Sequence, residues 1–172
     1  VLSWLMGGRV AEVMGTAPEP PADEHGEPYQ VCGLITTPMF HVSATHACFL
    51  VGLASAAKIV MMYKWNARQA VELIEREKAS RFFGVPTMSA DLVQAASEMG
   101  ATLDTLRSVE AGGAKRPAAQ VGEIAKAVPH AQPSTGFGMT ETNALGIGIR
   151  GQDYIDRPGA TGRLYPPLQD MK

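Results

Sequence analysis

The sequence predicts an α/β fold, in which repeated strand-helix units form a mostly parallel sheet flanked by helices. Short apolar runs, VCGLITT, AKIVMMY, SRFFGV and LRSVEA, alternate from Val31 onward with longer segments whose apolar residues recur at helical spacing. The chain has 172 residues, of which 45% are apolar and 19% are charged, and this is enough material for one ordinary globular core.

An amphipathic helix is predicted at the start of the chain. Its apolar residues are Leu2, Leu5, Met6, Val10 and Val13. Residues 17–29 are proline-rich and acidic, and we expect an exposed loop there because closely spaced prolines disfavour regular structure. Because the chain begins at Val1, already inside the helical pattern, we expect residues 1–172 to be one partial domain of a longer protein.

Three later helices have recognisable ends. Asn66, with Gln69 three residues further on, predicts a capping box at the start of the first. Pro86 is suited to the start of the second, and Gly100 to its end. Pro117 is suited to the first turn of the third.

Charge and hydropathy argue against two kinds of partner. The net charge of -2 provides no excess of cations to neutralise phosphates, so no nucleic acid is expected. The longest apolar run, residues 44–57, falls short of the roughly 18 residues needed to cross a bilayer, and it predicts a buried helix instead. No secretory signal precedes it, so we expect a cytoplasmic protein in which Cys32 and Cys48 are reduced, buried thiols.

Two further patterns are interpreted as chance matches. His41, His46 and Cys48 lie close together in the sequence, but no further ligand follows at metal-site spacing, so no zinc site is expected. Residues 146–151, GIGIRG, match the G-x-G-x-x-G pattern of dinucleotide binding. That fingerprint requires a helix beginning at the glycines, and the following QDYIDRPGATG contains proline and more glycine, so no regular helix is expected there.

Four loops are predicted at the carboxyl ends of strands, where ligands bind in open α/β sheets. They are TTPMFH, VPTMS, EAGGAK and STGFGMTET, and we expect them to face one cleft. The stretch GFGMTET, residues 136–142, combines glycines, an aromatic ring, hydroxyls and a carboxylate, which suit a planar ligand, phosphate oxygens and a magnesium ion. The simpler interpretation is a glycine-containing turn followed by a helix that Thr140 or Thr142 caps.

GFGMTET resembles the Y/F-G-x-T-E motif of the class I adenylate-forming superfamily, which contains acyl-CoA synthetases, aryl-CoA synthetases and peptide-synthetase adenylation domains. Four other stretches are similar to this family and occur in its order: TTPMFHVSA, FFGVPTM, VEAGGAK and RPGATGRLYP. They extend from about Thr36 to Pro167. The resemblance implies an internal piece of the large N-terminal domain of an AMP-binding enzyme.

The resemblance also implies roles for individual residues. The implied nucleotide-binding residues are Gly112, Gly113, Ala114, Gly136, Phe137, Gly138, Met139 and Thr140. Among these, Phe137 would stack on adenine. Three residues are implied as catalytic: Thr140 would contact the α-phosphate and the substrate carboxylate, Glu141 would coordinate magnesium, and His41 would border the carboxylate and the acyl pocket.

The implied reaction is the activation of a small-molecule carboxylic acid, with a medium- or long-chain fatty acid as the expected substrate. The carboxylate attacks the α-phosphorus of ATP, pyrophosphate leaves, and coenzyme A captures the acyl-adenylate. The implied enzyme is an AMP-forming acid-thiol ligase that uses ATP/AMP, Mg²⁺ and coenzyme A. Such chemistry depends mostly on positioning and charge stabilisation, so no nucleophilic side chain is needed.

Departures from the family pattern leave alternatives open. Ala111 stands where many relatives have Ser, and Lys115-Arg116-Pro117 replaces a commoner Pro-Leu, so the acid preference is open. The family's lysine-ended phosphate loop, its T-G-D aspartate and its C-terminal lysine have no match in the sequence, so we expect the chain alone to be inactive. The alternatives are a non-catalytic truncated subdomain that forms a homo-oligomer through exposed surfaces, or a peptide-synthetase adenylation domain.

Overall fold

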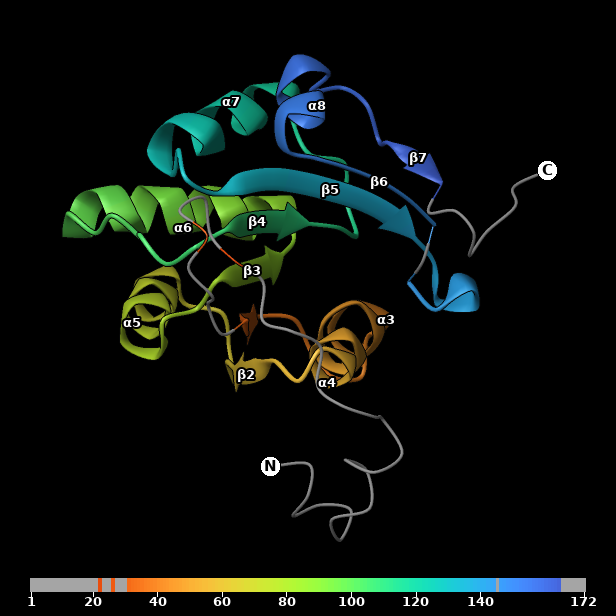
Figure 1. Cartoon of the computed structure of the whole chain (residues 1–172), viewed down its shortest axis with the longest axis horizontal. Helices are drawn as coiled ribbons and strands as arrows, with labels where there is room; N and C mark the ends of the chain where they lie inside the picture. Colours follow the sequence, from red (N-terminus) through yellow and green to blue (C-terminus); the bar gives the residue numbers. More distant parts are fainter. Residues whose placement is uncertain (1–21, 23–25, 27–30, 145, 165–172) are drawn as a thin grey trace, which may run out of the picture.

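The computed structural model describes residues 22, 26, 31–144 and 146–164, and these form a seven-stranded sheet in the order β2-β1-β3-β4-β5-β6-β7 (Figure 1). The strands are β1 (Cys32–Ile35), β2 (Lys58–Met61), β3 (Arg81–Gly84), β4 (Ser108–Ala111), β5 (Gln132–Gly138), β6 (Gly146–Arg150) and β7 (Arg163–Leu164). Strands β1 to β5 pair in parallel, while β6 pairs antiparallel with both β5 and β7. The predicted α/β class is confirmed.

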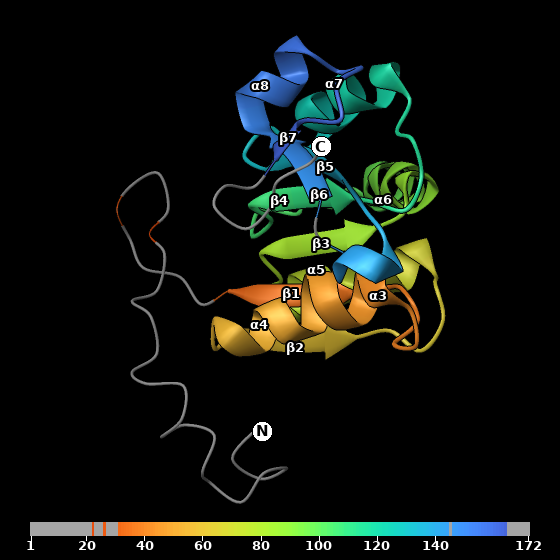
Figure 2. The same cartoon turned by 90° about the vertical axis from the view of Figure 1, so that its right-hand side faces the viewer.

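Helices cover both faces of the sheet. The helical elements are α3 (Val42–Ala44), the π-helical η1 (Thr45–Leu50), α4 (Val51–Ala54), α5 (Ala67–Glu77), α6 (Pro86–Met99), α7 (Ala118–Ala127), the 3₁₀ turn η2 (Thr140–Thr142) and α8 (Gly151–Asp156). Helices α5, α6 and α7 lie on one face, and the continuous segment α3-η1-α4 lies on the other, beside β1 and β2 (Figure 2). No helix within the described ranges is both long and apolar enough to cross a bilayer.

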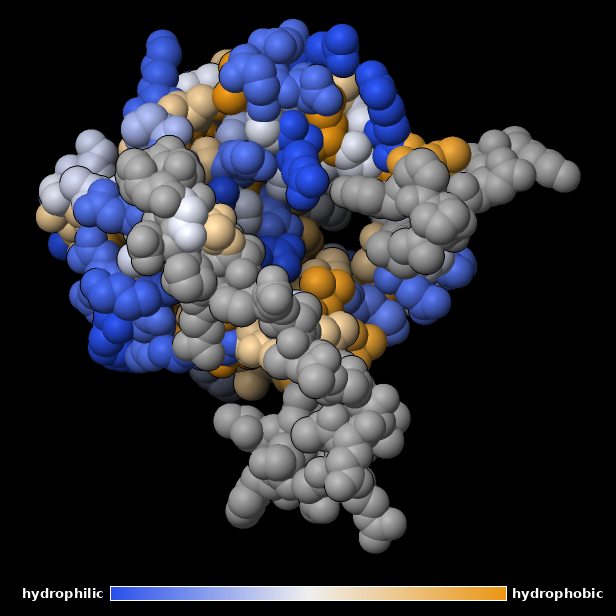
Figure 3. All heavy atoms as spheres, viewed as in Figure 1, coloured by the Kyte–Doolittle hydropathy of each residue, from blue (hydrophilic) through white to orange (hydrophobic). Residues whose placement is uncertain are grey.

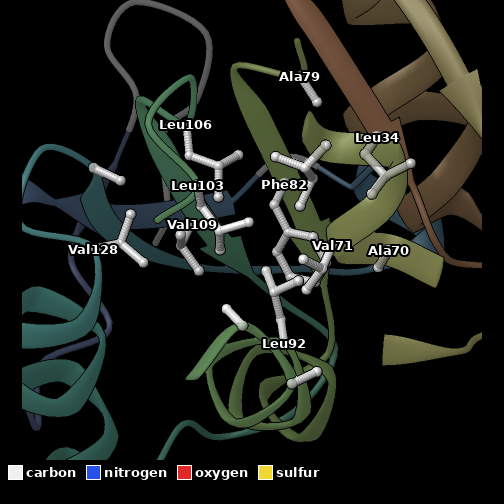
Figure 4. Packing of buried hydrophobic residues seen from close by; sticks show 14 of the residues in the cluster. Leu34, Ala70, Val71, Ala79, Phe82, Leu92, Leu103, Leu106, Val109 and Val128 are labelled. Atoms are coloured by element: carbon white, nitrogen blue, oxygen red, sulfur yellow. The ribbon is translucent and has the colours of Figure 1, made fainter. Parts of the chain in front are cut away.

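The hydrophobic core lies between the sheet and helices α5 to α7. Phe82 of β3 and Val109 of β4 are completely buried there, together with Val71 of α5 and Leu92 of α6 (Figure 4). Successive residues of a strand point to opposite faces, so the neighbours of Phe82 and Val109 face away from this core. Burying each large apolar side chain of this kind contributes about 1.5–3 kcal/mol.

The helix ends follow the sequence closely. The Asn66 Oδ1 atom accepts a hydrogen bond of 2.9 Å from the Gln69 backbone N–H, so Asn66 caps α5 as predicted. Helix α6 begins at Pro86 and ends where Gly100 adopts a left-handed φ of 65°. Pro117 takes the position before the first residue of α7 rather than a place within its first turn.

The segment 44–57 is helical as far as Ala54, but the prediction that it is buried is wrong. Within it only Ala44 and Gly52 are buried, whereas Leu50 and Val51 are 48% and 42% exposed. Only one side of the segment packs on the sheet, and another borders a cavity. An apolar run alone does not distinguish a side chain that meets the core from one that meets an open cavity.

The expectation that no regular helix follows GIGIRG is also wrong, because α8 begins at Gly151, where a φ of 59° turns the chain away from β6. Pro158 lies beyond its end and does not interrupt it. Gly146 and Gly148 lie within β6 itself, whereas in the dinucleotide fingerprint the glycines form a loop between strand and helix.

The helix predicted at residues 1–16, and all but residues 22 and 26 of the loop predicted at 17–29, lie outside the described residues.

Candidate active site

A cavity of about 710 Å³ lies between strands β3, β4 and β5 and the segment α3-η1-α4, and its lining extends from Arg81 at the start of β3 to Thr140 beyond the end of β5. It is visible as a hollow bordered by hydrophobic residues (Figure 3). Three of the four predicted loops, TTPMFH, EAGGAK and STGFGMTET, contribute lining residues. VPTMS is not among the lining segments, because Pro86 leads directly into α6 on the opposite face of the sheet and Ser89 is buried there. The prediction that all four loops face one cleft is therefore corrected to three.

The stretch GFGMTET forms the end of β5 and the short turn η2. Strand β5 continues to Gly138, so Phe137 lies in a strand, paired with Ile147 of β6, and not in the turn that the sequence suggested. Its ring is 48% exposed and lines the cavity. An exposed aromatic ring at the mouth of a cavity can stack on a planar ligand at little cost in stability.

The threonines of this stretch differ in environment. The Met139 backbone N–H donates to Thr142 Oγ1 at 3.1 Å, so Thr142 stabilises the turn, in partial agreement with the simpler interpretation of a capped helix start. Thr140 is exposed and lines the cavity, as Met139 does. Glu141 is exposed but is not among the lining residues. Glu141 directly follows the lining residue Thr140 in the sequence, and its carboxylate is open to solvent.

His41 lies on the other side of the cavity, at the start of α3. Its Nδ1 atom accepts a hydrogen bond of 3.1 Å from the Ser43 backbone N–H. An accepting Nδ1 requires, in a neutral imidazole, that the proton be on Nε2. The ring is exposed, so Nε2–H is available as a donor towards a ligand in the cavity.

The glycine loop after β4 gives the cavity part of its shape. Gly112 and Gly113 line it, whereas Ala114 is exposed outside the lining. A side chain at Gly112 would place its Cβ 3.3 Å from the Phe83 ring, and Gly113 has a left-handed φ of 77°. Both positions therefore favour glycine and leave backbone atoms accessible to a ligand.

An ion pair outside the family-like motif residues also lines the cavity. The Arg81 guanidinium contacts Glu110 through two hydrogen bonds, Nε to Oε1 at 2.8 Å and Nη2 to Oε2 at 2.9 Å. Ser108 Oγ donates to the same Oε1 at 2.7 Å. The sequence carries one indication of this pair. Within SRFFGV and LRSVEA, Arg81 is next to Phe82 and Glu110 is next to Val109, so both charged residues lie on the strand face opposite the two core residues.

Cys48 lies near this ion pair and is not bonded to another cysteine. Burial, and secondarily the charge of Glu110, raises the pKa of the Cys48 thiol to about 12. The thiol is therefore protonated at neutral pH. Cys32 is buried as expected, while Cys48 is only half-buried. Within the described part of the chain, no group of three or more His, Cys, Asp and Glu side chains is placed to hold a metal ion.

Comparison with models of protein families matches residues 10–172 to the AMP-binding enzyme family. The chain belongs to this family. The predicted membership of the adenylate-forming enzymes is thereby confirmed.

Curated relatives of the AMP-binding chain include several CoA ligases. It is 30% identical over 138 residues to 4-coumarate–CoA ligase-like 6 of Arabidopsis thaliana, covering 79% of this chain and 24% of that protein. It is 37% identical over 113 residues to 4-coumarate–CoA ligase-like 3 of Oryza sativa subsp. japonica, covering 63% and 19%. It is 28% identical over 137 residues to 4-chlorobenzoate–CoA ligase of a Pseudomonas species, covering 78% and 25%. The chain thus spans about a quarter or less of the length of these relatives.

Solved structures agree on the fold. A putative long-chain-fatty-acid CoA ligase from Rhodopseudomonas palustris matches with a TM-score of 0.68 and 25% identity, covering 78% of this chain and 32% of that one. The N-terminal domain of FACL13 from Mycobacterium tuberculosis matches with a TM-score of 0.70 and 23% identity, covering 79% and 34%. The sheet and helices described above therefore correspond to about a third of the fold of these solved structures.

Proposed function

We propose that this chain is the cavity-bearing part of a full-length ligase that activates a carboxylic acid with ATP and transfers the acyl group to coenzyme A. The observation that carries the proposal is the cavity itself. It brings together His41, Gly112, Phe137 and Thr140, which are far apart in the sequence and belong to three stretches that resemble the family's motifs. Their chemistry suits the separate parts of an acyl-adenylate.

The nucleotide would lie along the carboxyl ends of β4 and β5. The half-exposed Phe137 ring provides a flat apolar surface for adenine, and the backbone of Gly112 and Gly113 passes beside it without side chains that would obstruct a ligand. Stacking of a base on an aromatic side chain contributes about 1–3 kcal/mol. Gly136, Gly138, Met139 and Ala114 complete the proposed nucleotide-binding set.

The acid would lie between η2 and α3. Thr140 Oγ1 and the Nε2–H of His41 are donors on opposite sides of the cavity, and both suit the carboxylate oxygens of the acid. In the reaction a carboxylate oxygen forms a bond to the α-phosphorus, the bond from that phosphorus to the bridging oxygen of pyrophosphate breaks, and pyrophosphate leaves. The thiol of coenzyme A then attacks the acyl carbon, and AMP leaves.

Glu141 would hold magnesium. Mg²⁺ keeps several of its waters and commonly binds through one or two carboxylates together with substrate phosphates. A single exposed carboxylate directly after Thr140 fits that donor set. Bound there, the ion would neutralise charge on the phosphate oxygens of ATP.

A medium- or long-chain fatty acid is the substrate class to be tested first. We further propose that residues 1–172 alone form no acyl-adenylate. A carrier thiol as acceptor, as in peptide synthetases, is the competing function, and a homo-oligomer and a cytoplasmic location also stay predictions.

The test is made on the full-length ligase with Phe137→Ala, Phe137→Tyr and Glu141→Gln, measuring ATP affinity, single-turnover adenylation and melting temperature. Phe137→Ala should weaken ATP binding by about 1–3 kcal/mol, and Phe137→Tyr should retain it because the aromatic face is kept. Glu141→Gln should slow adenylation much more than it weakens ATP binding, since charge develops in the transition state. If Glu141→Gln adenylates at nearly the wild-type rate, the metal role is wrong and η2 is only a capped turn.

A further inference from the structure

We propose that Glu110 determines acid specificity by accepting a hydrogen bond from a hydroxyl or amino group at the end of the acid remote from its carboxylate. This inference rests on the proposed function and concerns the same cavity. Glu110, Arg81 and Thr140 all line that cavity, so one ligand can reach from the proposed carboxylate position to the ion pair.

The register of the sheet gives the depth of the ion pair. Glu110 precedes Gly112 by two residues, and at about 3.3 Å per residue its backbone lies about 7 Å nearer the amino end of β4. Arg81 is paired with Ser108, four residues before Gly112, and its backbone lies about 13 Å from the level of Gly112 in the same direction. Both charged residues therefore line the part of the cavity towards the amino ends of the strands, and an acid whose carboxylate lies near Thr140, beyond the carboxyl end of β5, meets them with its far end.

The hydrogen bonds of Glu110 leave it with capacity for a ligand. An ionised carboxylate offers about four acceptor positions. Among the residues that the structure describes, Oε1 accepts from Arg81 Nε and Ser108 Oγ, while Oε2 accepts only from Arg81 Nη2. Oε2 can therefore accept one more bond, and because a carboxylate is only an acceptor it selects a donor.

The surroundings make this selection effective. The Glu110 side chain is only 20% exposed, and the apolar residues Ala47, Leu50 and Phe83 line the cavity with it. Arg81 balances the charge, so a neutral hydroxyl is a sufficient partner. An acid ending in a methyl group would cover the ion pair without offering it a hydrogen bond, and sites built to bind a hydroxyl reject analogues that lack one.

The test compares matched acids on the full-length ligase: octanoate with 8-hydroxyoctanoate, and 3-phenylpropanoate with 3-(4-hydroxyphenyl)propanoate. The wild type should show a kcat/KM at least about tenfold higher for the hydroxylated acid in one or both pairs. Removing Glu110 alone would take the carboxylate away from the partly buried Arg81 guanidinium and destabilise the fold, so both are replaced together, Arg81→Leu with Glu110→Leu. This double variant should prefer the unsubstituted acid, with the KM for ATP within about twofold of wild type.

A matched control is the exposed ion pair between Arg68 and Glu98, which joins α5 to α6 and does not line the cavity. Arg68→Leu with Glu98→Leu makes the same chemical change and should leave acid preference unaltered. The inference is overturned if the wild type uses both members of each pair equally, or if the double variant at the cavity keeps the wild-type preference. If no acid supports ATP-pyrophosphate exchange, the proposed function itself is wrong.

Discussion

The two faces of strands β3 and β4 carry opposite kinds of residues. Towards helices α5 to α7, Phe82 and Val109 are completely buried among apolar side chains. Towards α3-η1-α4, their chain neighbours Arg81, Phe83 and Glu110 line a cavity. The pleat of the strand alternates the faces residue by residue, so the same eight-residue ladder supplies the core and the binding surface. Stability and ligand recognition can therefore be altered separately by changing adjacent residues.

The largest expected effect tests that separation directly with the neighbours Phe82 and Phe83. Phe82→Ala should lower the free energy of unfolding by about 3–5 kcal/mol, because it opens a void in a fully packed core. Phe83→Ala should cost roughly 1–2 kcal/mol and should instead alter the KM for the acid. Denaturant unfolding and steady-state kinetics measure the two quantities. Equal losses of stability for both variants would contradict the distinction between the faces.

The second prediction concerns how η1 packs on the side of the sheet that bears the cavity. The reactivity of the Cys48 thiol, which lies in η1, measures this packing. With a pKa of about 12 instead of the ordinary 9.0, its thiolate fraction at pH 8 should be about a thousandfold lower, and alkylation correspondingly slower than in denaturant. The fold favours the protonated thiol over the thiolate. Because the thiolate fraction then increases up to the raised pKa, the alkylation rate should keep rising about tenfold per pH unit above pH 9. Iodoacetamide labelling of a Cys32→Ser variant measures the alkylation rate of Cys48 at each pH. A rate that levels off near pH 9 would show that this side of the sheet is open to solvent at Cys48.

The smallest expected effect concerns Arg116, a charged residue buried beside Ser89 of α6, on the side of the sheet that carries the hydrophobic core. Arg116 is 3% exposed, its Nη2 donates to Ser89 Oγ at 3.4 Å, and its Nε and Nη1 atoms have no hydrogen-bond partner among the described residues. Burial lowers the pKa of this guanidinium. Arg116→Leu should therefore raise the free energy of unfolding by about 1–2 kcal/mol, measured by denaturant unfolding with Arg116→Lys as the control. A loss of stability would indicate that an anionic group from outside the described residues pairs with Arg116.

The sequence by itself determined strands β1 to β4, helices α5 to α7, and the residues at which α5 begins and α6 begins and ends. Apolar spacing located β1 to β4, Asn66 marked the start of α5, and Gly100 marked the end of α6, because these features act within a few residues of the chain. The resemblance also selected His41, Gly112, Phe137 and Thr140, which the structure places around one cavity. Their roles stay predictions.

Only the tertiary structure decided which residues face the cavity. Helix α6 begins at Pro86, so VPTMS lies on the opposite face of the sheet. Strand β6 pairs antiparallel with β5 as far as Gly138, so Phe137 lies in a strand and not in a turn. The contact between Arg81 and Glu110 depends on the register between β3 and β4, which is a pairing between residues 29 positions apart. Local pattern fixes which residues share a face of one strand, but the register that brings charges on two strands together is set by the packing of the whole sheet.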